Sequence, residues 1–139
     1  MKQHQEWVEV RTRGRGLFEV TERVRAAVAA SGVTTGVVHV YCTHTSCSLC
    51  IQENADPTAR HDLEQWLERI APENDPHYTH TFEGPDDMPS HLRALVTRTC
   101  ETIPVADGRP AFGRWQGLYL CEHRARGHTR RLLVHVQGA

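Results

Sequence analysis

Lysine, long apolar runs and flexible linkers are scarce in this sequence. Lys2 is the only lysine among 16 basic residues, and no apolar run approaches the roughly 18 residues that a membrane helix needs. The first residues, Met1 to Trp7, lack the apolar stretch of a signal peptide, and no tract rich in proline, glycine or serine divides the chain. A length of 139 residues therefore predicts a single domain, residues 1–139, with its own core and no membrane partner.

An excess of charge of either sign is also absent. The 16 Lys and Arg residues face 17 Asp and Glu residues, so the formal net charge is −1 and gives no electrostatic argument for nucleic acid as a partner. The basic cluster from Arg124 to Arg131 is typical of a solvated hairpin tip. Five cysteines, an odd number without a secretion signal, favour reduced thiols and a cytoplasmic location. The one surplus is histidine, with ten residues.

Hydrophobic periodicity predicts strands at both ends of the chain and three helices between them. Period-two alternation indicates strands over about 5–12, 36–52 (two strands or one bent strand), 99–105, 112–123 and 131–137. A first helix carries Val20, Val24, Ala27 and Val28 on one face and ends at Ser31-Gly32. Short turns between consecutive strands favour antiparallel pairing. The sequence therefore predicts an α+β domain, mostly an antiparallel sheet or sandwich with about three helices.

The other two helices are each expected to bury an apolar stripe. Asp56 as cap and Pro57 at the first position start the second helix, and Pro72 ends it. Its stripe consists of Ala59, Leu63, Trp66, Leu67 and Ile70. The third helix follows a cap at Asp86 or Asp87 and is expected to face the core with Met88, Leu92, Leu95 and Val96.

Four segments could carry chemistry. Thr43-His44-Thr45-Ser46 could hold a phosphate or flank a metal, although its hydroxyls could equally cap a turn. Glu53 lies at a strand end, where a carboxylate could bind a cation, whereas Asp56 already has a role as helix cap. The segment from His77 to His91 supplies enough imidazoles and carboxylates for a first-row metal, but its spacing matches no named zinc motif.

The fourth segment runs from Gly113 to Arg124 and reads as a strand with mixed faces. Glu122 and Arg124, two residues apart on one face, could be an ion pair or an active-site couple. A nucleophilic Ser/His/Asp site is not supported, because no Gly-x-Ser-x-Gly elbow exists.

Taken together, the motifs resemble the YjbQ family, often labelled secondary thiamine-phosphate synthases. The residues that carry the resemblance span nearly the whole chain and occur in this order: His44-Thr45-Ser46, Glu53 to Pro57, Glu83 to His91, Asp107-Gly108-Arg109, and Trp115 to Arg124. The resemblance implies a YjbQ-like fold that assembles as a homotrimer with motif residues near subunit boundaries. It also implies a weak thiamine-phosphate synthase activity, which joins hydroxymethylpyrimidine diphosphate to thiazole phosphate and releases pyrophosphate.

On this resemblance, the candidate residues fall into three groups. The catalytic candidates are His44, Glu53 and His91. The candidates for binding a phosphorylated small molecule are Thr45, Ser46, Trp115, Gln116 and Arg124. The candidate ligands of a divalent metal, Zn²⁺ or Mg²⁺, are His44, His80, Asp86 and His91. A competing hypothesis is a homotrimer that binds a metal or small ligand without turnover, for which the same side chains would serve.

Overall fold

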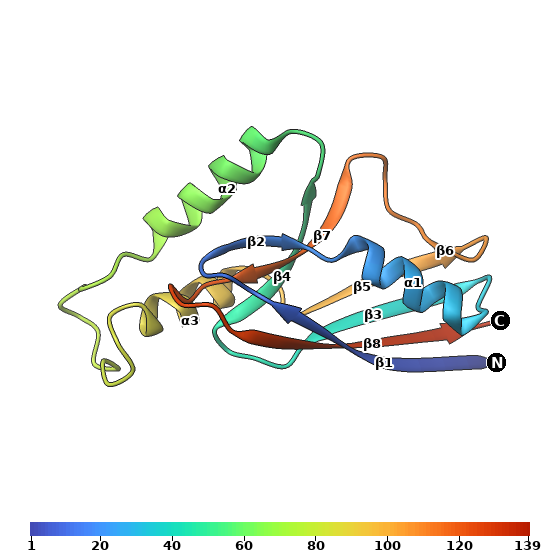
Figure 1. Ribbon diagram of the computed structural model, residues 1–139, viewed down its shortest axis with the longest axis horizontal. Coiled ribbons are helices and arrows are strands. Elements are labelled where there is room, and N and C mark those ends of the chain that lie inside the picture. The colour runs from blue at the N-terminus through green and yellow to red at the C-terminus, as the bar shows by residue number, and fades with distance from the viewer.

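The strands form two antiparallel sheets, and three helices lie around them (Figure 1). The strands are β1 (Lys2–Arg11), β2 (Gly16–Glu19), β3 (Gly36–Cys42), β4 (Cys47–Glu53), β5 (Cys100–Ala106), β6 (Arg109–Pro110), β7 (Gln116–Glu122) and β8 (Thr129–Gly138). The helices are α1 (Thr21–Ser31), α2 (Pro57–Ile70) and α3 (Asp87–Val96). In this computed structural model of residues 1–139, the larger sheet has the order β1-β8-β3-β5-β6 and the smaller β2-β7-β4. The predicted α+β domain is confirmed.

One core fills the space between the two sheets and α1. Val24, Ala27 and Val28 of α1 are buried there, as their spacing predicts, against strand residues such as Val38 and Leu120. The helix ends where Gly32 adopts the left-handed conformation with φ 70°, which glycine enters without steric cost. Burial of this apolar face holds the larger sheet in place.

The predicted burial of the α2 stripe is wrong. Asp56 caps the helix by accepting a hydrogen bond from the Thr58 amide, as expected, but no residue of α2 is fully buried. Trp66 is 50% exposed, and only Leu63 and Leu67 pack against the small cluster of Leu17, Tyr119 and Cys121. Ile70 is exposed as well, and Figure 1 shows α2 projecting away from the sheets.

The predicted orientation of α3 is also wrong. Leu95 is 79% exposed, and the helix buries Asp87, Pro89, Ser90 and Arg93 instead. The buried polar groups are held by hydrogen bonds and an ion pair, which compensate their desolvation. The helix is therefore anchored by polar contacts rather than by an apolar stripe.

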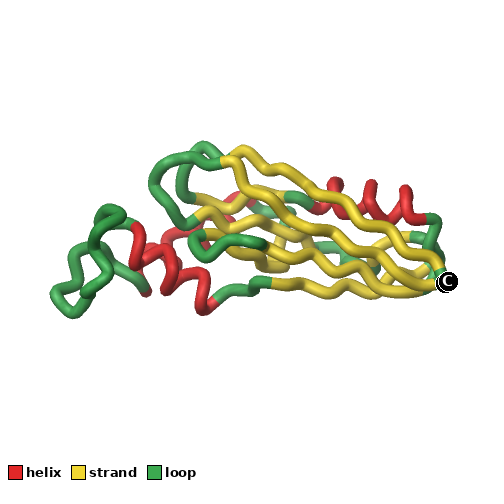
Figure 2. Tube along the Cα trace, turned by 90° about the horizontal axis from the view of Figure 1, so that it is seen from below, coloured by secondary structure: helices red, strands yellow, loops and turns green.

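The molecule is elongated, and its two ends differ in character. The N- and C-termini lie together at one end, while α3 and the loop before it extend beyond the strands at the other (Figures 1 and 2). None of the helices is long and apolar enough to cross a membrane. The end that carries α3 holds most of the polar clusters.

Candidate metal centre

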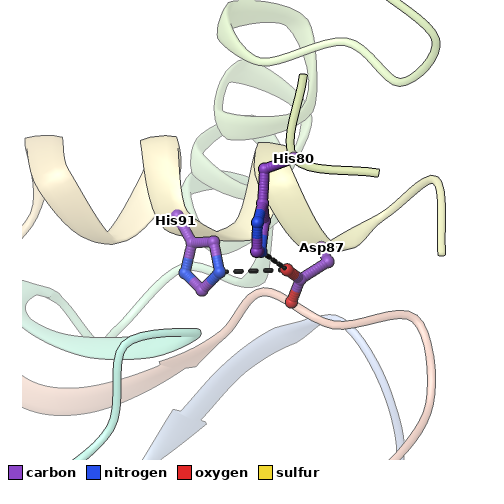
Figure 3. Close-up of side chains that lie close together, drawn as sticks. All are labelled: His80, Asp87 and His91. Atoms are coloured by element: carbon purple, nitrogen blue, oxygen red, sulfur yellow. Dashed lines mark hydrogen bonds and ion pairs between the residues drawn. The ribbon is translucent and has the colours of Figure 1, made fainter. Parts of the chain in front are cut away.

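Two imidazoles and one carboxylate converge at the start of α3 (Figure 3). His80 Nε2 lies 2.9 Å from Asp87 Oδ2, and His91 Nε2 lies 3.0 Å from the same oxygen. The three ligand-type atoms are all within 4.8 Å of one another. Asp87 is buried, whereas His80 is exposed and His91 is half-buried, so the cluster is open on one side.

The local sequence explains why these groups meet. Asp87 and His91 are four residues apart on α3, so they share one helix face. His80 comes from the loop that precedes α3 and points at the same carboxylate (Figure 3). Ser90 Oγ donates to the Asp87 carbonyl oxygen and helps to fix this first turn.

The hydrogen bond from His91 to Thr45 sets the tautomer of the imidazole. His91 Nδ1 lies 2.9 Å from the Thr45 carbonyl oxygen, so Nδ1 must carry the proton. In the neutral ring, Nε2 then presents a lone pair to Asp87 Oδ2, and two acceptors 3.0 Å apart need a proton or a cation between them. Metal-binding histidines commonly donate their other N–H to a carbonyl in this way.

Arg124 binds two neighbouring aspartates, Asp86 and Asp87, on the side away from the histidines. Its Nη1 donates to Asp87 Oδ1 at 2.9 Å and its Nε to Asp86 Oδ2 at 2.9 Å, which leaves Asp87 Oδ2 for the histidines. Burial raises the pKa of Asp86, but hydrogen bonds from Arg124 and the Ala125 amide outweigh it and hold that pKa below its usual value. The same contacts raise the pKa of Arg124, chiefly through its hydrogen bond to Asp86.

A cleft of about 850 Å³ lies against the cluster, which suits a small molecule. His80 and His91 form part of its wall together with His44. The remaining wall is mixed and includes Met88 and Leu95 but no lysine or arginine. A ligand in this cleft would meet imidazoles, hydroxyls and apolar surface.

Two of the predicted metal ligands lie outside the cluster. His44 is on the cleft wall, but its Nε2 accepts a hydrogen bond of 2.9 Å from the Arg131 amide. Burial, with a contribution from Arg130, lowers the pKa of His44. The Asp86 carboxylate contacts Arg124 instead. The aspartate that joins the histidine cluster is its neighbour, Asp87. The spacing of Asp87 and His91 by four residues is the sequence signal that places Asp87, rather than Asp86, on the same helix face as His91.

Of the three side chains predicted to contact phosphate, those of Ser46 and Arg124 have other partners in the structure. Thr45 contributes its carbonyl to His91, and Ser46 Oγ accepts from Arg130 Nη2 at 3.0 Å. The Arg124 guanidinium is occupied by Asp86, Asp87 and the Glu83 carbonyl. Arg124 therefore positions the acidic pair and has no free fork for a phosphate.

The remaining candidates, Glu53, Trp115 and Gln116, gather at the opposite end of the smaller sheet. In the β4–β7 register, Cys47 pairs with Glu122 near the cleft, whereas Glu53 pairs with Gln116. Six residue steps separate the two ends, which is about 20 Å. Trp115 is 55% exposed there, beside the guanidinium of Arg114. Within one chain, Glu53 therefore cannot touch a group bound at His91.

Comparison with known proteins identifies the family. A family model described as UPF0047 protein YjbQ-like matches residues 6–139. A UPF0047 protein of Synechocystis is 46% identical and covers 99% of this chain and 93% of its own, and UPF0047 protein YjbQ of Escherichia coli is 40% identical over 97% and 98%.

Solved structures agree with this result. An uncharacterized conserved protein of the YjbQ/UPF0047 family from Clostridium acetobutylicum has a TM-score of 0.88 at 28% identity and covers 95% of this chain and 99% of its own. A conserved hypothetical protein from Thermus thermophilus has a TM-score of 0.85 at 33% identity, with the same coverage. The resemblance inferred from the motifs is confirmed, and the chain belongs to the YjbQ-like UPF0047 family.

Proposed function

We propose that the chain is a divalent-metal enzyme that acts on a phosphorylated small molecule in the cleft beside α3. The observation that supports this most strongly is the convergence of His80 and His91, which line that cleft, on the buried carboxylate of Asp87. Three protein ligands with one open position are the usual arrangement of a catalytic zinc site. Two imidazoles and a carboxylate also suit Mn²⁺ or Fe²⁺, while Mg²⁺ prefers an all-oxygen set.

Two of the three separations between ligand atoms suit a metal, whereas the two imidazole nitrogens, up to 4.8 Å apart, would have to move about 1.5 Å closer together. Ligand atoms about 2 Å from a tetrahedral zinc lie about 3.3 Å from one another. The separations of 2.9 and 3.0 Å between Asp87 Oδ2 and the two Nε2 atoms are within a few tenths of an ångström of that geometry. A bound ion would supply charge to polarise a substrate oxygen or to activate water. His44, on the same wall, would donate a hydrogen bond from Nδ1–H to a substrate oxygen, because its Nε2 accepts from the Arg131 amide.

The reaction that the family resemblance suggests is the condensation catalysed by thiamine-phosphate synthases. Its diphosphate leaving group needs a cation to absorb the developing charge. Since no arginine or lysine lines the cleft, that cation would be the metal in our proposal. The apolar wall at Met88 and Leu95 would then accept a ring.

A homotrimer would explain the separation of the motif residues into two groups. Glu53, Trp115 and Gln116 lie about 20 Å along the sheet from Cys47, which lines the cleft, and this separates them from the histidines within one chain. In our proposal, the Glu53 end of one copy faces the cleft of the next, so that each site draws on two chains. Trp115, half-exposed in the single chain, would form part of that contact.

The same separation favours a second candidate, a metal-binding homotrimer without turnover. Of the three catalytic candidates, only His44 and His91 line the cleft of one chain, and Glu53 does not. In this alternative the ion and the cleft bind a small ligand, and the Glu53 end has a purely structural role.

Activity of matched variants separates the two candidates. We expect His91→Ala and Glu53→Gln to abolish both rescue of a thiamine-requiring strain and condensation by the purified protein. His61→Ala is the control, because His61 is an exposed histidine on α2. Unchanged rescue by both variants, with zinc binding lost only in His91→Ala, would reject catalysis and support the binding alternative.

A further inference from the structure

A second, smaller cavity of about 140 Å³ lies between β2, α2 and the buried face of α3. It shares no lining residue with the cleft beside the histidines. The charged groups at its wall are Arg15, Arg93, Glu64, Glu68 and Glu122, and the charge of Glu122 is already paired with Arg130. With this volume, the cavity has room for several waters or for one small polyatomic ion.

Arg93 is a buried cation without an acidic partner. It is 2% exposed, and its Nε and Nη2 donate to the carbonyl oxygens of Leu67 and Ala71, each at 2.8 Å. These bonds satisfy the end of α2, but no carboxylate lies within ion-pair distance and Nη1 has no hydrogen-bond partner. Burial, and then the charge of Arg15, lower the pKa of Arg93, yet a guanidinium stays protonated. No carboxylate is therefore in direct contact with its charge.

Arg15 provides a second unused donor at the same cavity. Its Nη1 and Nη2 pair with Glu68 and Glu73 at 2.7 and 3.3 Å, while its buried Nε has no partner. Two guanidinium N–H groups on one small cavity match the oxygens of an oxyanion. A neutral water could bond to either group but would leave the charge of Arg93 uncompensated.

The wall also contains acceptors, which limits the kind of anion that fits. Glu64 Oε2 accepts from the Leu17 amide at 2.9 Å, and Glu68 Oε1 accepts from Arg15. The second oxygen of each glutamate makes no hydrogen bond within the chain. His123 adds no positive charge, because burial lowers its pKa to about 3 and its Nε2 contacts Ser48 Oγ at 2.8 Å. A fully deprotonated anion has no hydroxyl hydrogen to donate to the free carboxylate oxygens of Glu64 and Glu68.

We propose that this cavity binds inorganic hydrogen phosphate, with Arg93 and Arg15 donating to its oxygens and its own hydroxyl donating to Glu64. Near neutral pH phosphate keeps at least one proton, whereas sulfate keeps none. The mixture of cationic donors and carboxylate acceptors therefore selects phosphate over sulfate. The site is independent of the metal centre, because the two cavities have no residue in common.

Calorimetric titration of the full chain with sodium phosphate and with sodium sulfate, at equal ionic strength, tests this proposal. A chelator is included so that phosphate cannot bind through a metal at His91. We expect phosphate to bind at least about tenfold more tightly than sulfate. Arg93→Met should weaken phosphate binding at least about tenfold, whereas Arg69→Met, which removes an exposed arginine of the same region, should leave it unchanged.

Glu64→Gln keeps the test informative if Arg93→Met does not fold, since Arg93 also supports the end of α2. An amide at position 64 can donate to sulfate, so we expect the preference for phosphate to fall by at least about threefold. Equal binding of the two anions to the unmodified chain would overturn the proposal. No binding of phosphate, the result expected of a cavity that holds only water, would overturn it as well.

Discussion

Nδ1 of His91 lies 2.9 Å from the carbonyl oxygen of Thr45, and this bond joins the first turns of α3 to the connection between β3 and β4. It places the lone pair of Nε2 opposite Asp87 Oδ2. In the proposed metal centre, Asp87 rather than its neighbour Asp86 is the carboxylate ligand.

Substitution of each aspartate in turn tests this distinction. We expect Asp87→Asn to weaken zinc binding by about 100-fold, because it removes the anionic ligand between the two imidazoles. Asp86→Asn should weaken it by less than about tenfold, since Asp86 contacts only Arg124 and the Ala125 amide. Competition with a chromophoric chelator measures both affinities. Equal losses in the two variants would contradict the assignment of Asp87.

The buried pair of Glu122 and Arg130 should contribute strongly to stability. Glu122 is 1% exposed and accepts hydrogen bonds from Arg130 Nε at 2.8 Å and from Thr12 Oγ1 at 2.6 Å. Glu122→Gln leaves a buried guanidinium without its counter-charge, so we expect a loss of about 3–5 kcal/mol in the free energy of unfolding. Glu22→Gln, which breaks an exposed pair with Arg25, should cost less than about 1 kcal/mol. Urea denaturation measures both, and similar losses would refute the prediction.

Lowering the pH should destabilise the fold already at pH values above those at which carboxylates take up protons. Burial lowers the pKa of His123 from 6.5 to about 3, so below pH 6.5 the unfolded chain binds a proton that the folded chain excludes. At pH 5 this difference amounts to about 2 kcal/mol of lost stability. His44, whose pKa burial also lowers, acts in the same direction. Glu122 and Asp86, whose pKa values are lowered, add to the loss only as the pH falls below about 4.5.

Urea denaturation of the metal-free chain at pH 6.5 and pH 5 measures this effect. His123→Gln should reduce the difference between the two pH values, whatever its effect on stability at pH 6.5. An unchanged difference in this variant would show that His123 is not the group responsible.

Gly36 allows β3 and β8 to approach closely. A Cβ at this position would lie 2.1 Å from the Gln137 carbonyl oxygen and 2.8 Å from the Gly138 Cα, both backbone atoms. We expect Gly36→Ala to destabilise the chain by at least about 2 kcal/mol. Gly113→Ala meets only the flexible Gln116 side chain, at 3.3 Å, and should cost less than about 1 kcal/mol. Thermal unfolding of the two variants provides the comparison.

The fold could be predicted where local signals suffice. Gly32 ends α1, and Asp56 with Pro57 starts α2, because capping and backbone conformation depend on neighbouring residues. The buried faces of α2 and α3 could not be predicted in this way. An apolar stripe does not reveal whether another element covers it, and α3 is oriented by contacts such as Arg93 to Leu67, 26 residues away.

The candidate site, like the fold, could be predicted only in part. His80 and His91 were expected to act together, and the structure brings them onto one carboxylate. The separation of His44 from that cluster depends on its bond to the Arg131 amide, 87 residues away, which the pairing of β3 with β8 sets. No local pattern carries that information. The choice between Asp86 and Asp87 was available from the i, i+4 spacing to His91.

Anomalous diffraction at the zinc edge, from crystals of the full chain grown with one equivalent of zinc, tests the metal centre most directly. We expect one strong peak about 2 Å from His80 Nε2, His91 Nε2 and Asp87 Oδ2. A peak on other ligands, or none near these three side chains, would contradict the proposed centre.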